Sequence, residues 1–172
     1  FGGLPELTDG LLKMTEEKKI GLSLPSLRID NFSLELMEKV QKVRKSGIIF
    51  APEAGTQRLR DVRNKIITEE SILSSTKLLF NGGWTNVKLY FMIGLPTETD
   101  TDVCGIAELA GKVLDVYFQT PKEERAKNIN ITVSTSSFVP KPFTAFQWVA
   151  MDSRDELIRK QKLIKESIPS KR

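Results

Sequence analysis

The feature that most constrains the fold of this chain is an alternation of short apolar runs with amphipathic segments of helical spacing. Four apolar runs of strand length recur along the chain, separated by such segments. This alternation is typical of a parallel sheet, because the return to each next parallel strand needs a long crossover, usually a helix. The predicted strands are Gly21–Ile29, Ile48–Pro52, Val87–Ile93 and Ile129–Ser137.

Capping signals predict where the helices begin and end. One helix is expected to begin at Ser33 and to stop before Gly47, and another begins at Thr68 with two glutamates in its first turn. Apolar residues from Val103 to Tyr117 recur at helical spacing and predict a third helix. A capping box at Ser153 predicts a last helix. The segment between the second strand and Thr68 is expected to be a loop.

The strand–helix units recur at a spacing of roughly 30 to 45 residues, which is typical of β/α barrels. We therefore predict an α/β fold: a partial, open β/α barrel of TIM type, with about four parallel strands and outer helices. Residues 1–20 are expected to be the helical remnant of a preceding β/α unit, 21–150 the partial barrel, and 151–172 a C-terminal helix and tail. An open sheet edge exposes unpaired backbone groups, so self-association is expected.

In the last two predicted strands, polar and apolar residues alternate. The apolar face is expected to pack on helices and the polar face to line a ligand cavity.

The scarcity of cysteine and the lack of histidine exclude several classes of site. Cys104 is the single cysteine and the chain has no histidine, which excludes disulfides, Cys/His zinc sites, serine triads and thiolate–imidazole catalysis within it. Cys104 is expected in a helix core. No apolar run is long enough for a membrane span and no leader pattern is present, so a cytoplasmic protein without membrane contact is expected. The first residue, Phe1, indicates a piece of a longer polypeptide.

The formal net charge of +4 is compatible with a polyanionic partner. Lysine and arginine nevertheless share their helical segments with aspartate and glutamate, a pattern that indicates solvated helix faces.

The predicted strand ends are the places to search for function, because ligands of parallel β/α folds collect at the carboxyl ends of the strands. Two of these ends place a glycine close to a carboxylate, so that the backbone can approach a ligand and a carboxylate can accept hydrogen bonds. The four ends read Ser26-Leu27-Arg28, Pro52-Glu53-Ala54-Gly55, Gly94-Leu95-Pro96-Thr97-Glu98-Thr99 and Ser136-Ser137-Phe138-Val139-Pro140-Lys141-Pro142.

In this order the motifs between Ser26 and Thr99 resemble the central portion of the radical S-adenosylmethionine (radical SAM) barrel. The similar subgroup includes tRNA methylthiotransferases, elongator-type proteins and oxygen-independent coproporphyrinogen dehydrogenases. The later run SSFVPKPFTAFQW is similar to a motif in a branch of iron–sulfur oxidoreductases with a cobalamin-binding-like domain. That branch has His and Pro where this chain has Phe143 and Ala145.

The resemblance implies a radical SAM enzyme in which a CxxxCxxC loop holds a [4Fe–4S] cluster and the cluster binds S-adenosylmethionine. This chain lacks that loop, so it would hold only units three to six of the barrel, and alone it is expected to be inactive and to bind no cluster. The intact protein would generate a 5′-deoxyadenosyl radical, with cobalamin in another domain as an option. The implied partners are the missing N-terminal barrel half, a reductant such as flavodoxin or ferredoxin, and an RNA substrate.

The resemblance also implies cofactor-binding positions, while no catalytic residue and no metal ligand is assigned. Glu53 would contact the methionine or ribose portion of S-adenosylmethionine, and Lys65 its carboxylate. The remaining positions are Ser26 and Arg28 beside the cofactor, and Tyr90 and Gly94 against its ribose and adenine.

Several of these residues also have a purely structural interpretation. Glu53 can pair with Arg58 or Arg60, and Lys65 can be a solvated lysine. Arg28 can pair with Asp30 or Glu98. Tyr90 can be a core residue, Gly94 can serve a turn, and Pro140-Lys141-Pro142 can stiffen the last loop.

Two functions of different classes stay open at this point. One is a redox-silent binding module that kept the barrel strands without the cluster. The second is an aldolase-type barrel enzyme in which Lys88 or Lys141 forms a Schiff base.

Overall fold

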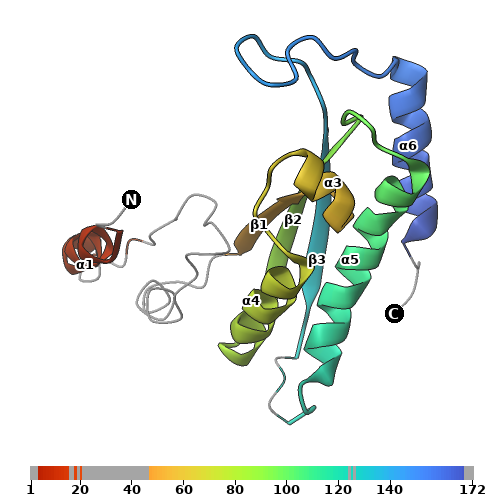
Figure 1. The fold of residues 1–172 in the computed structure, drawn as a ribbon. Helices are drawn as coiled ribbons and strands as arrows, with labels where there is room; N and C mark the ends of the chain where they lie inside the picture. Colours follow the sequence, from red (N-terminus) through yellow and green to blue (C-terminus); the bar gives the residue numbers. More distant parts are fainter. Residues whose placement is uncertain are drawn as a thin grey trace.

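The structure is a computed structural model that describes residues 4–15, 18, 20, 47–123, 125 and 127–168. Within these residues, three parallel strands form one sheet in the order β1-β2-β3 (Figure 1). The strands are β1 (Ile48–Glu53), β2 (Asn86–Ile93) and β3 (Asn130–Ser137). These bounds confirm three predicted strands to within one residue. The first predicted strand, residues 21–29, and the helix predicted after it lie outside the described residues.

The helices are α1 (Leu4–Thr15), α3 (Gln57–Val62), α4 (Glu69–Asn81), α5 (Asp100–Gln119) and α6 (Arg154–Ser167). Thr68 caps α4 as predicted, and its hydroxyl accepts from the Ser71 N–H. Ser153 likewise accepts from the Glu156 N–H at the start of α6. The reciprocal capping box that the sequence predicted at Ser153 is found on α5, between Thr99 and Asp102.

Two helix predictions need correction. The segment expected to be a loop contains α3, which Thr56 caps by accepting from the Leu59 N–H. A helix of six residues is too short to show a periodic apolar pattern, so it escaped prediction. Cys104, expected in a helix core, is half-buried on α5, where the Ser167 hydroxyl donates to its sulfur at 3.5 Å.

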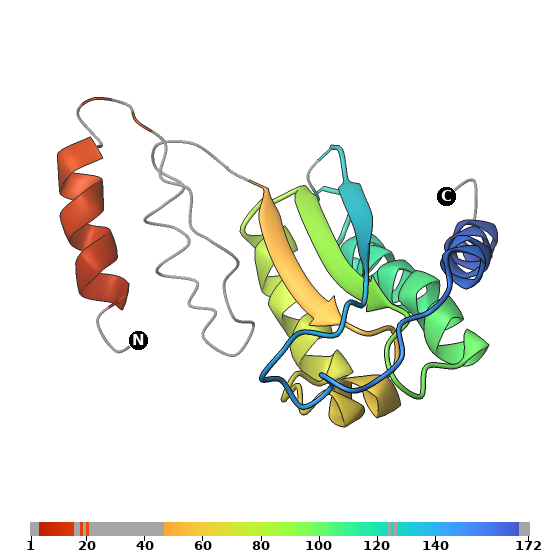
Figure 2. The same cartoon turned by 90° about the horizontal axis from the view of Figure 1, so that it is seen from above.

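Helices cover one face of the sheet. Figure 2 shows α4 and α5 packed along the same side of the three strands. The apolar side chains of β2 alternate into this interface, where Leu89 and Ile93 are fully buried. On the opposite face of β2, Lys88 and Met92 are half-buried and Tyr90 is exposed. The alternation predicted from the sequence is therefore present, with one face packed and the other polar.

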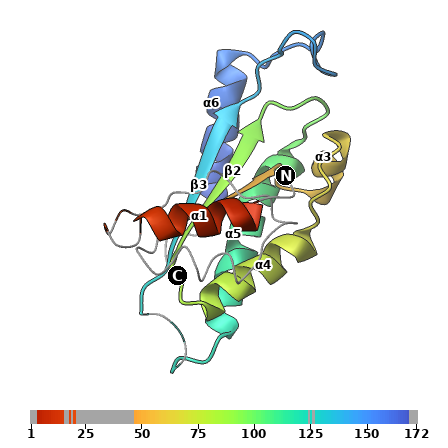
Figure 3. The same ribbon diagram turned by 90° about the vertical axis from the view of Figure 1, so that its left-hand side faces the viewer.

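Parallel pairing of β2 with β3 is regular, from Asn86 opposite Asn130 to Ile93 opposite Ser137. Figure 3 shows these two strands running side by side in the same direction. Their carboxyl ends therefore lie together. A three-stranded parallel sheet with helices along one face is consistent with a partial TIM-type barrel, which confirms the predicted fold class.

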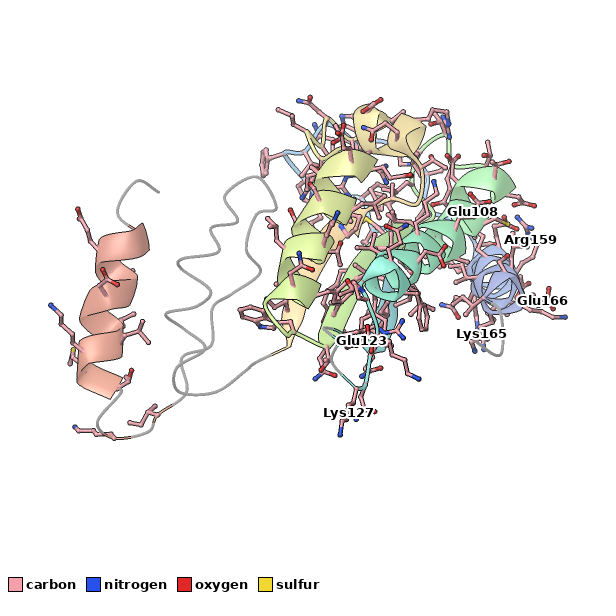
Figure 4. The ribbon with its side chains drawn as sticks, turned by 90° about the horizontal axis from the view of Figure 1, so that it is seen from below. Glu108, Glu123, Lys127, Arg159, Lys165 and Glu166 are labelled. Atoms are coloured by element: carbon pink, nitrogen blue, oxygen red, sulfur yellow. The ribbon has the colours of Figure 1, made fainter. Side chains whose placement is uncertain are left out.

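A second, smaller apolar cluster closes the carboxyl ends of the strands. It combines Ala54 and Leu59 from the β1–α3 region with Leu95 and Phe138 from the ends of β2 and β3. Phe146 and Val149 pack on it and so anchor the segment 138–150. The opposite end of the sheet carries the α5–β3 connection with its charged residues, among them Glu123 and Lys127 (Figure 4). No helix in the described part of the chain is long and apolar enough to cross a membrane.

Candidate functional site

The carboxyl end of β1 is irregular at Glu53. The pairing of β1 with β2 shifts between Phe50 and Glu53, so Glu53 lies opposite Phe91. Glu53 has a φ of 70°, in the left-handed region that favours glycine. Bulges of this kind redirect side chains and are frequent beside active sites.

The Glu53 carboxylate lies between two cations. Lys65 donates to its Oε1 at 2.6 Å, and Arg63 Nη2 lies 2.8 Å from its Oε2. The Arg63 contact is an ion pair without hydrogen-bond geometry, and Oε2 is buried without a hydrogen-bond partner. Arg63 Nη1 also approaches the Met92 sulfur at 3.3 Å. The three charged side chains, which we call the Glu53 cluster (Glu53, Arg63 and Lys65), are each between 24% and 31% exposed.

The charge of the Glu53 cluster is unbalanced, because two cations share one carboxylate. A second carboxylate from a ligand would complete the pairing, while Glu53 offers an acceptor to an ammonium or hydroxyl group. The cluster therefore has the donor and acceptor set for a zwitterionic ligand such as an amino acid.

Arg60 supports the Glu53 cluster from inside the protein. Its side chain is fully buried, and Nη1 donates to the Ala54 carbonyl at 2.9 Å, directly after Glu53. Its own carbonyl accepts from the Lys65 N–H at 2.9 Å. Nη2 donates to Gln57 at 3.1 Å, and Nε has no hydrogen-bond partner. Burial lowers the pKa of Arg60. Arg60 therefore fixes the backbone directly after Glu53 through its side chain and the backbone of Lys65 through its carbonyl.

The first turn of α5 is fixed to the β1–α3 loop through Asp102, whose side chain is 2% exposed. Its carboxylate accepts from the Thr99 N–H at 2.8 Å and the Thr99 hydroxyl at 2.7 Å, and also from Arg58 and Thr56. Burial alone would raise the pKa of Asp102, but the hydrogen bonds from Arg58, Thr56 and Thr99 outweigh it and lower the pKa to about 2.

This depressed pKa predicts an acid-sensitive contribution to stability. The carboxylate stabilises the fold above its unfolded pKa near 4, and this contribution is lost as the pH falls toward about 2. A shift of this size corresponds to about 2 kcal/mol. We expect the unfolding free energy of Asp102→Asn, from urea titrations, to fall by about 2 kcal/mol less than that of the wild type between pH 5 and pH 2. Exposed Asp155→Asn is the control, and an unchanged pH slope in Asp102→Asn would contradict the assignment.

Of the remaining site residues predicted from the sequence, Tyr90 and Gly94 lie in the described part of the chain. Tyr90 lies on the polar sheet face with the Lys88 amine 4.7 Å from its ring centre. Gly94 has a φ of 79°, and a Cβ there would lie 3.0 Å from the Asp152 carboxylate. Its close approach is therefore to the protein itself. Ser26 and Arg28 lie outside the described residues.

The charged residues that were expected to form ion pairs have different partners in the structure. Glu53 pairs with Arg63 and Lys65, not with Arg58 or Arg60. Arg63 escaped prediction because it lies in the segment expected to be a loop, where the sequence does not indicate a direction for a side chain. Glu98, considered as a partner of Arg28, forms a buried ion pair with Lys160 at 2.8 Å.

Neither lysine considered for a Schiff base lies in a closed apolar site. Lys141 is exposed, and Lys88 is half-buried beside Tyr90. An amine nucleophile needs desolvation or a neighbouring cation to be activated.

Metal ligands do not cluster in the part of the chain that the structure describes, where no group of three or more His, Cys, Asp and Glu side chains could hold a metal ion.

Comparison with known proteins gives two matches. A family model described as the radical SAM superfamily matches residues 2–110, which include β1, β2 and the whole Glu53 cluster. The chain is also similar to an uncharacterised protein of Methanocaldococcus jannaschii, with 34% identity over 137 residues. That alignment covers 80% of this chain and 28% of the relative, so this chain corresponds to a minor part of the relative's length.

Proposed function

Because the chain belongs to the radical SAM superfamily, we propose that its Glu53 cluster binds the methionine end of S-adenosylmethionine in the whole protein. The observation that carries the proposal is the pairing of one carboxylate with two cations at the carboxyl end of β1. Ligands of parallel β/α folds bind at this end of the sheet.

The chemistry of the ligand matches that of the cluster. The methionine end of S-adenosylmethionine carries an ammonium group and a carboxylate. Arg63 and Lys65 can pair with the carboxylate, and Glu53 can accept from the ammonium group or a ribose hydroxyl. Because Glu53 carries one negative charge and Arg63 and Lys65 carry two positive charges, the cluster has one positive charge in excess that can pair with the carboxylate of the ligand.

S-adenosylmethionine bound in this way would supply radical chemistry to the whole protein once a reduced [4Fe–4S] cluster provided one electron, and Glu53, Arg63 and Lys65 would hold its methionine end. The protein's contribution is to orient the cofactor and to exclude water. The described residues contain no group of three or more side chains that could hold a metal ion, so we propose that another part of the whole protein holds the cluster.

The backbone of Glu53 supports a functional role for its side chain. A left-handed conformation costs a residue with a Cβ on the order of 1 kcal/mol or more, and such strained residues cluster at functional sites. Glycine would relieve this strain. A glutamate at this position is therefore better explained by its carboxylate than by the fold.

The experiment is calorimetric titration of S-adenosylmethionine into the full-length protein with its cluster present. Each charge-assisted hydrogen bond adds about 1.5 to 3 kcal/mol, so Glu53→Ala and Lys65→Ala should weaken binding by roughly tenfold to a hundredfold. Iron content should stay unchanged.

Two variants separate binding from folding. Lys112→Ala breaks an ion pair with Glu69 of the same 2.6 Å length on the outer helices, and it should not alter affinity. Glu53→Gly removes the carboxylate and relieves the backbone strain, so affinity should fall without a lower melting temperature. Wild-type affinity in both Glu53→Ala and Lys65→Ala would refute the role of the cluster.

The finer parts of the resemblance remain proposals for the whole protein. They are membership of the methylthiotransferase and elongator-type subgroup, a cobalamin-binding-like domain, a flavodoxin or ferredoxin reductant, and a cytoplasmic location. Tyr90 and Gly94 are proposed to lie on the ribose and adenine side of the cofactor, as are Ser26 and Arg28 beside it.

A further inference from the structure

One face of the sheet carries polar side chains, while α4 and α5 pack along the other side (Figure 2). β2 and β3 pair in register, so Lys88 lies opposite Thr132 and Tyr90 opposite Ser134. These four side chains lie on the face away from the helices, because the residues that alternate with them pack into the core. We call this surface the Lys88 face, and its members are Lys88, Tyr90, Met92, Thr132 and Ser134.

Lys88 is half-buried without a carboxylate beside it in the described part of the chain. Of the lysines in that part, only Lys65, Lys88 and Lys160 are not exposed. Lys65 pairs with Glu53 at 2.6 Å, and Lys160 pairs with two carboxylates. The Lys88 amine instead lies 4.7 Å from the centre of the Tyr90 ring. Burial of an ammonium group without an anionic partner costs free energy, so an anion bound at Lys88 would stabilise it.

The rest of the Lys88 face can donate hydrogen bonds to the same anion. Tyr90, Thr132 and Ser134 each carry a hydroxyl group, and none of these hydroxyls is hydrogen-bonded to the residues that the structure describes. Within β1, β2 and β3, Glu53 is the only carboxylate, and it already has two cations. The face thus combines donors with a positive charge, which is the set that an oxyanion such as a phosphate or carboxylate requires.

Met92 connects the Lys88 face to the Glu53 cluster. Its side chain leaves β2 on the same face as Lys88, and its sulfur lies 3.3 Å from Arg63 Nη1. The four residues from Lys88 to Met92 span about 13 Å along a strand, with Tyr90 between them. A molecule bound at Lys88 would therefore share a sheet face with the proposed cofactor and lie on the far side of Tyr90 from the Glu53 cluster.

The number of charges selects a small ligand over a polymer. Lys88 is the single basic residue of β1, β2 and β3. A nucleic-acid strand carries a negative charge at each linkage, and proteins that hold such a strand use several cations along its backbone. One amine without a carboxylate partner fits one oxyanion group, and the neighbouring hydroxyls fit further oxygen atoms of the same molecule.

We propose that the Lys88 face binds the substrate of the whole protein, and that this substrate is a small hydroxylated molecule with one oxyanion group. Its phosphate or carboxylate pairs with the Lys88 amine, and Thr132 and Ser134 hydrogen-bond to the same group or to the hydroxyls next to it. The inference names the substrate class for the cofactor site described above, and it rests on the proposed function in that respect.

The experiment follows the acetylation of individual lysines in the full-length protein by mass spectrometry of its peptides. A bound anion slows the reaction of an amine, because it favours the charged form, which is not nucleophilic. The probes are glucose 6-phosphate, gluconate and glucose, which share a hydroxylated carbon skeleton and carry a phosphate, a carboxylate and no charge. We expect at least one of the two anions to slow the acetylation of Lys88 saturably, and glucose to leave it unchanged. Exposed Lys77 and Lys141 are the controls in the same samples.

Matched variants test the residues of the face by calorimetric titration of the anion that protects Lys88. Lys88→Met removes the charge at a similar length and should weaken binding roughly tenfold to a hundredfold, as expected for the loss of a charge-assisted hydrogen bond. Lys88→Arg keeps the charge and should lose less affinity than Lys88→Met. Thr132→Val should weaken binding about twofold to tenfold. Lys77→Met, at an exposed position of α4, should leave it unchanged.

Several results would overturn the proposal. They are unchanged acetylation of Lys88 with both anions, equal protection by glucose, protection of Lys65 or Lys141 in place of Lys88, and undiminished affinity of Lys88→Met. Protection by one anion alone supports the proposal and assigns the group as phosphate or carboxylate. Because the titrations contain no S-adenosylmethionine, their failure is separate from that of the cofactor site. Lys88→Met should bind S-adenosylmethionine as the wild type does, and Lys88 should still be protected in Glu53→Ala.

Discussion

Replacement of Lys160 by methionine is expected to lower the free energy of unfolding by about 3 to 5 kcal/mol, the cost typical of breaking a buried ion pair from one side. The Lys160 amine donates to Asp152 at 2.7 Å and lies 2.8 Å from Glu98. The side chains of Lys160 and Glu98 are only 6% and 1% exposed. Methionine has a similar length, so the variant removes the charge and leaves two carboxylates without their cation.

This loss should reach the loop after β2. The carboxylate oxygen of Glu98 that faces Lys160 also accepts from the Gly94 N–H at 2.8 Å. Burial lowers the pKa of Lys160, but the hydrogen bonds to Asp152 and Glu98 reverse the effect, and the pKa is raised. Lys160 is therefore charged at neutral pH, and it joins α6 to the turn at Gly94.

Urea unfolding, followed through the buried Trp84, measures the effect. Lys162→Met is the matched control, because Lys162 is 75% exposed and faces Glu166 at 3.8 Å. An exposed pair of this kind contributes less than about 1 kcal/mol. If Lys160→Met lost no more stability than Lys162→Met, the buried ion pairs would not hold α6 to the sheet.

The sequence predicted the local part of this fold well, because the signals are local. β2 alternates buried and open positions, and its predicted bounds agree with the structure within one residue. Thr68 and Ser153 cap their helices as expected, since a cap needs only a side chain and an N–H three residues later. Short α3 has no comparable signal, apart from its cap Thr56.

The partners of charged residues could not be predicted in the same way. α6 is rich in charged residues, so its sequence indicates a solvated helix. In the structure Ile158 is 49% exposed, whereas Lys160 and Ile164, one turn apart, are buried. Lysine is almost never buried unless paired. Its carboxylate partner, Glu98, is distant in the sequence and is brought close only by the packing of α6.

In the candidate site, too, the local motif was predicted from the sequence and the partners of the charged side chains were not. The predicted motif at the end of β1 does contain Glu53 and lies near Lys65, and the structure joins them at 2.6 Å. Arg63 and the buried Arg60 were not identified, because their roles depend on the turn of α3 and on the direction in which each side chain leaves it. Gly55 was interpreted as a point of close approach to a ligand. Its neighbours in the structure are backbone atoms of α5.

Gly55→Ala is expected to cost about 3 kcal/mol or more of unfolding free energy, at the upper end of the range for overpacked positions. A Cβ at Gly55 would lie 2.6 Å from the Gly105 carbonyl carbon and would also meet the backbone of Asp102 and Ile106. Backbone atoms of a helix cannot move aside as a flexible side chain can. Either the loop or α5 must shift, and both carry residues that hold Asp102.

Gly111→Ala, a substitution within α5 itself, is expected to give the opposite result. A Cβ at Gly111 has no atom within 4 Å, so alanine should raise the unfolding free energy by up to about 1 kcal/mol through its helix propensity. Urea titrations of both variants give the comparison. If Gly55→Ala were tolerated as well as Gly111→Ala, the loop after β1 would not rest on the backbone of α5. The Glu53 cluster would then lack its fixed base, since Ala54 and Gly55 connect Glu53 to Arg60 through the hydrogen bonds of that guanidinium.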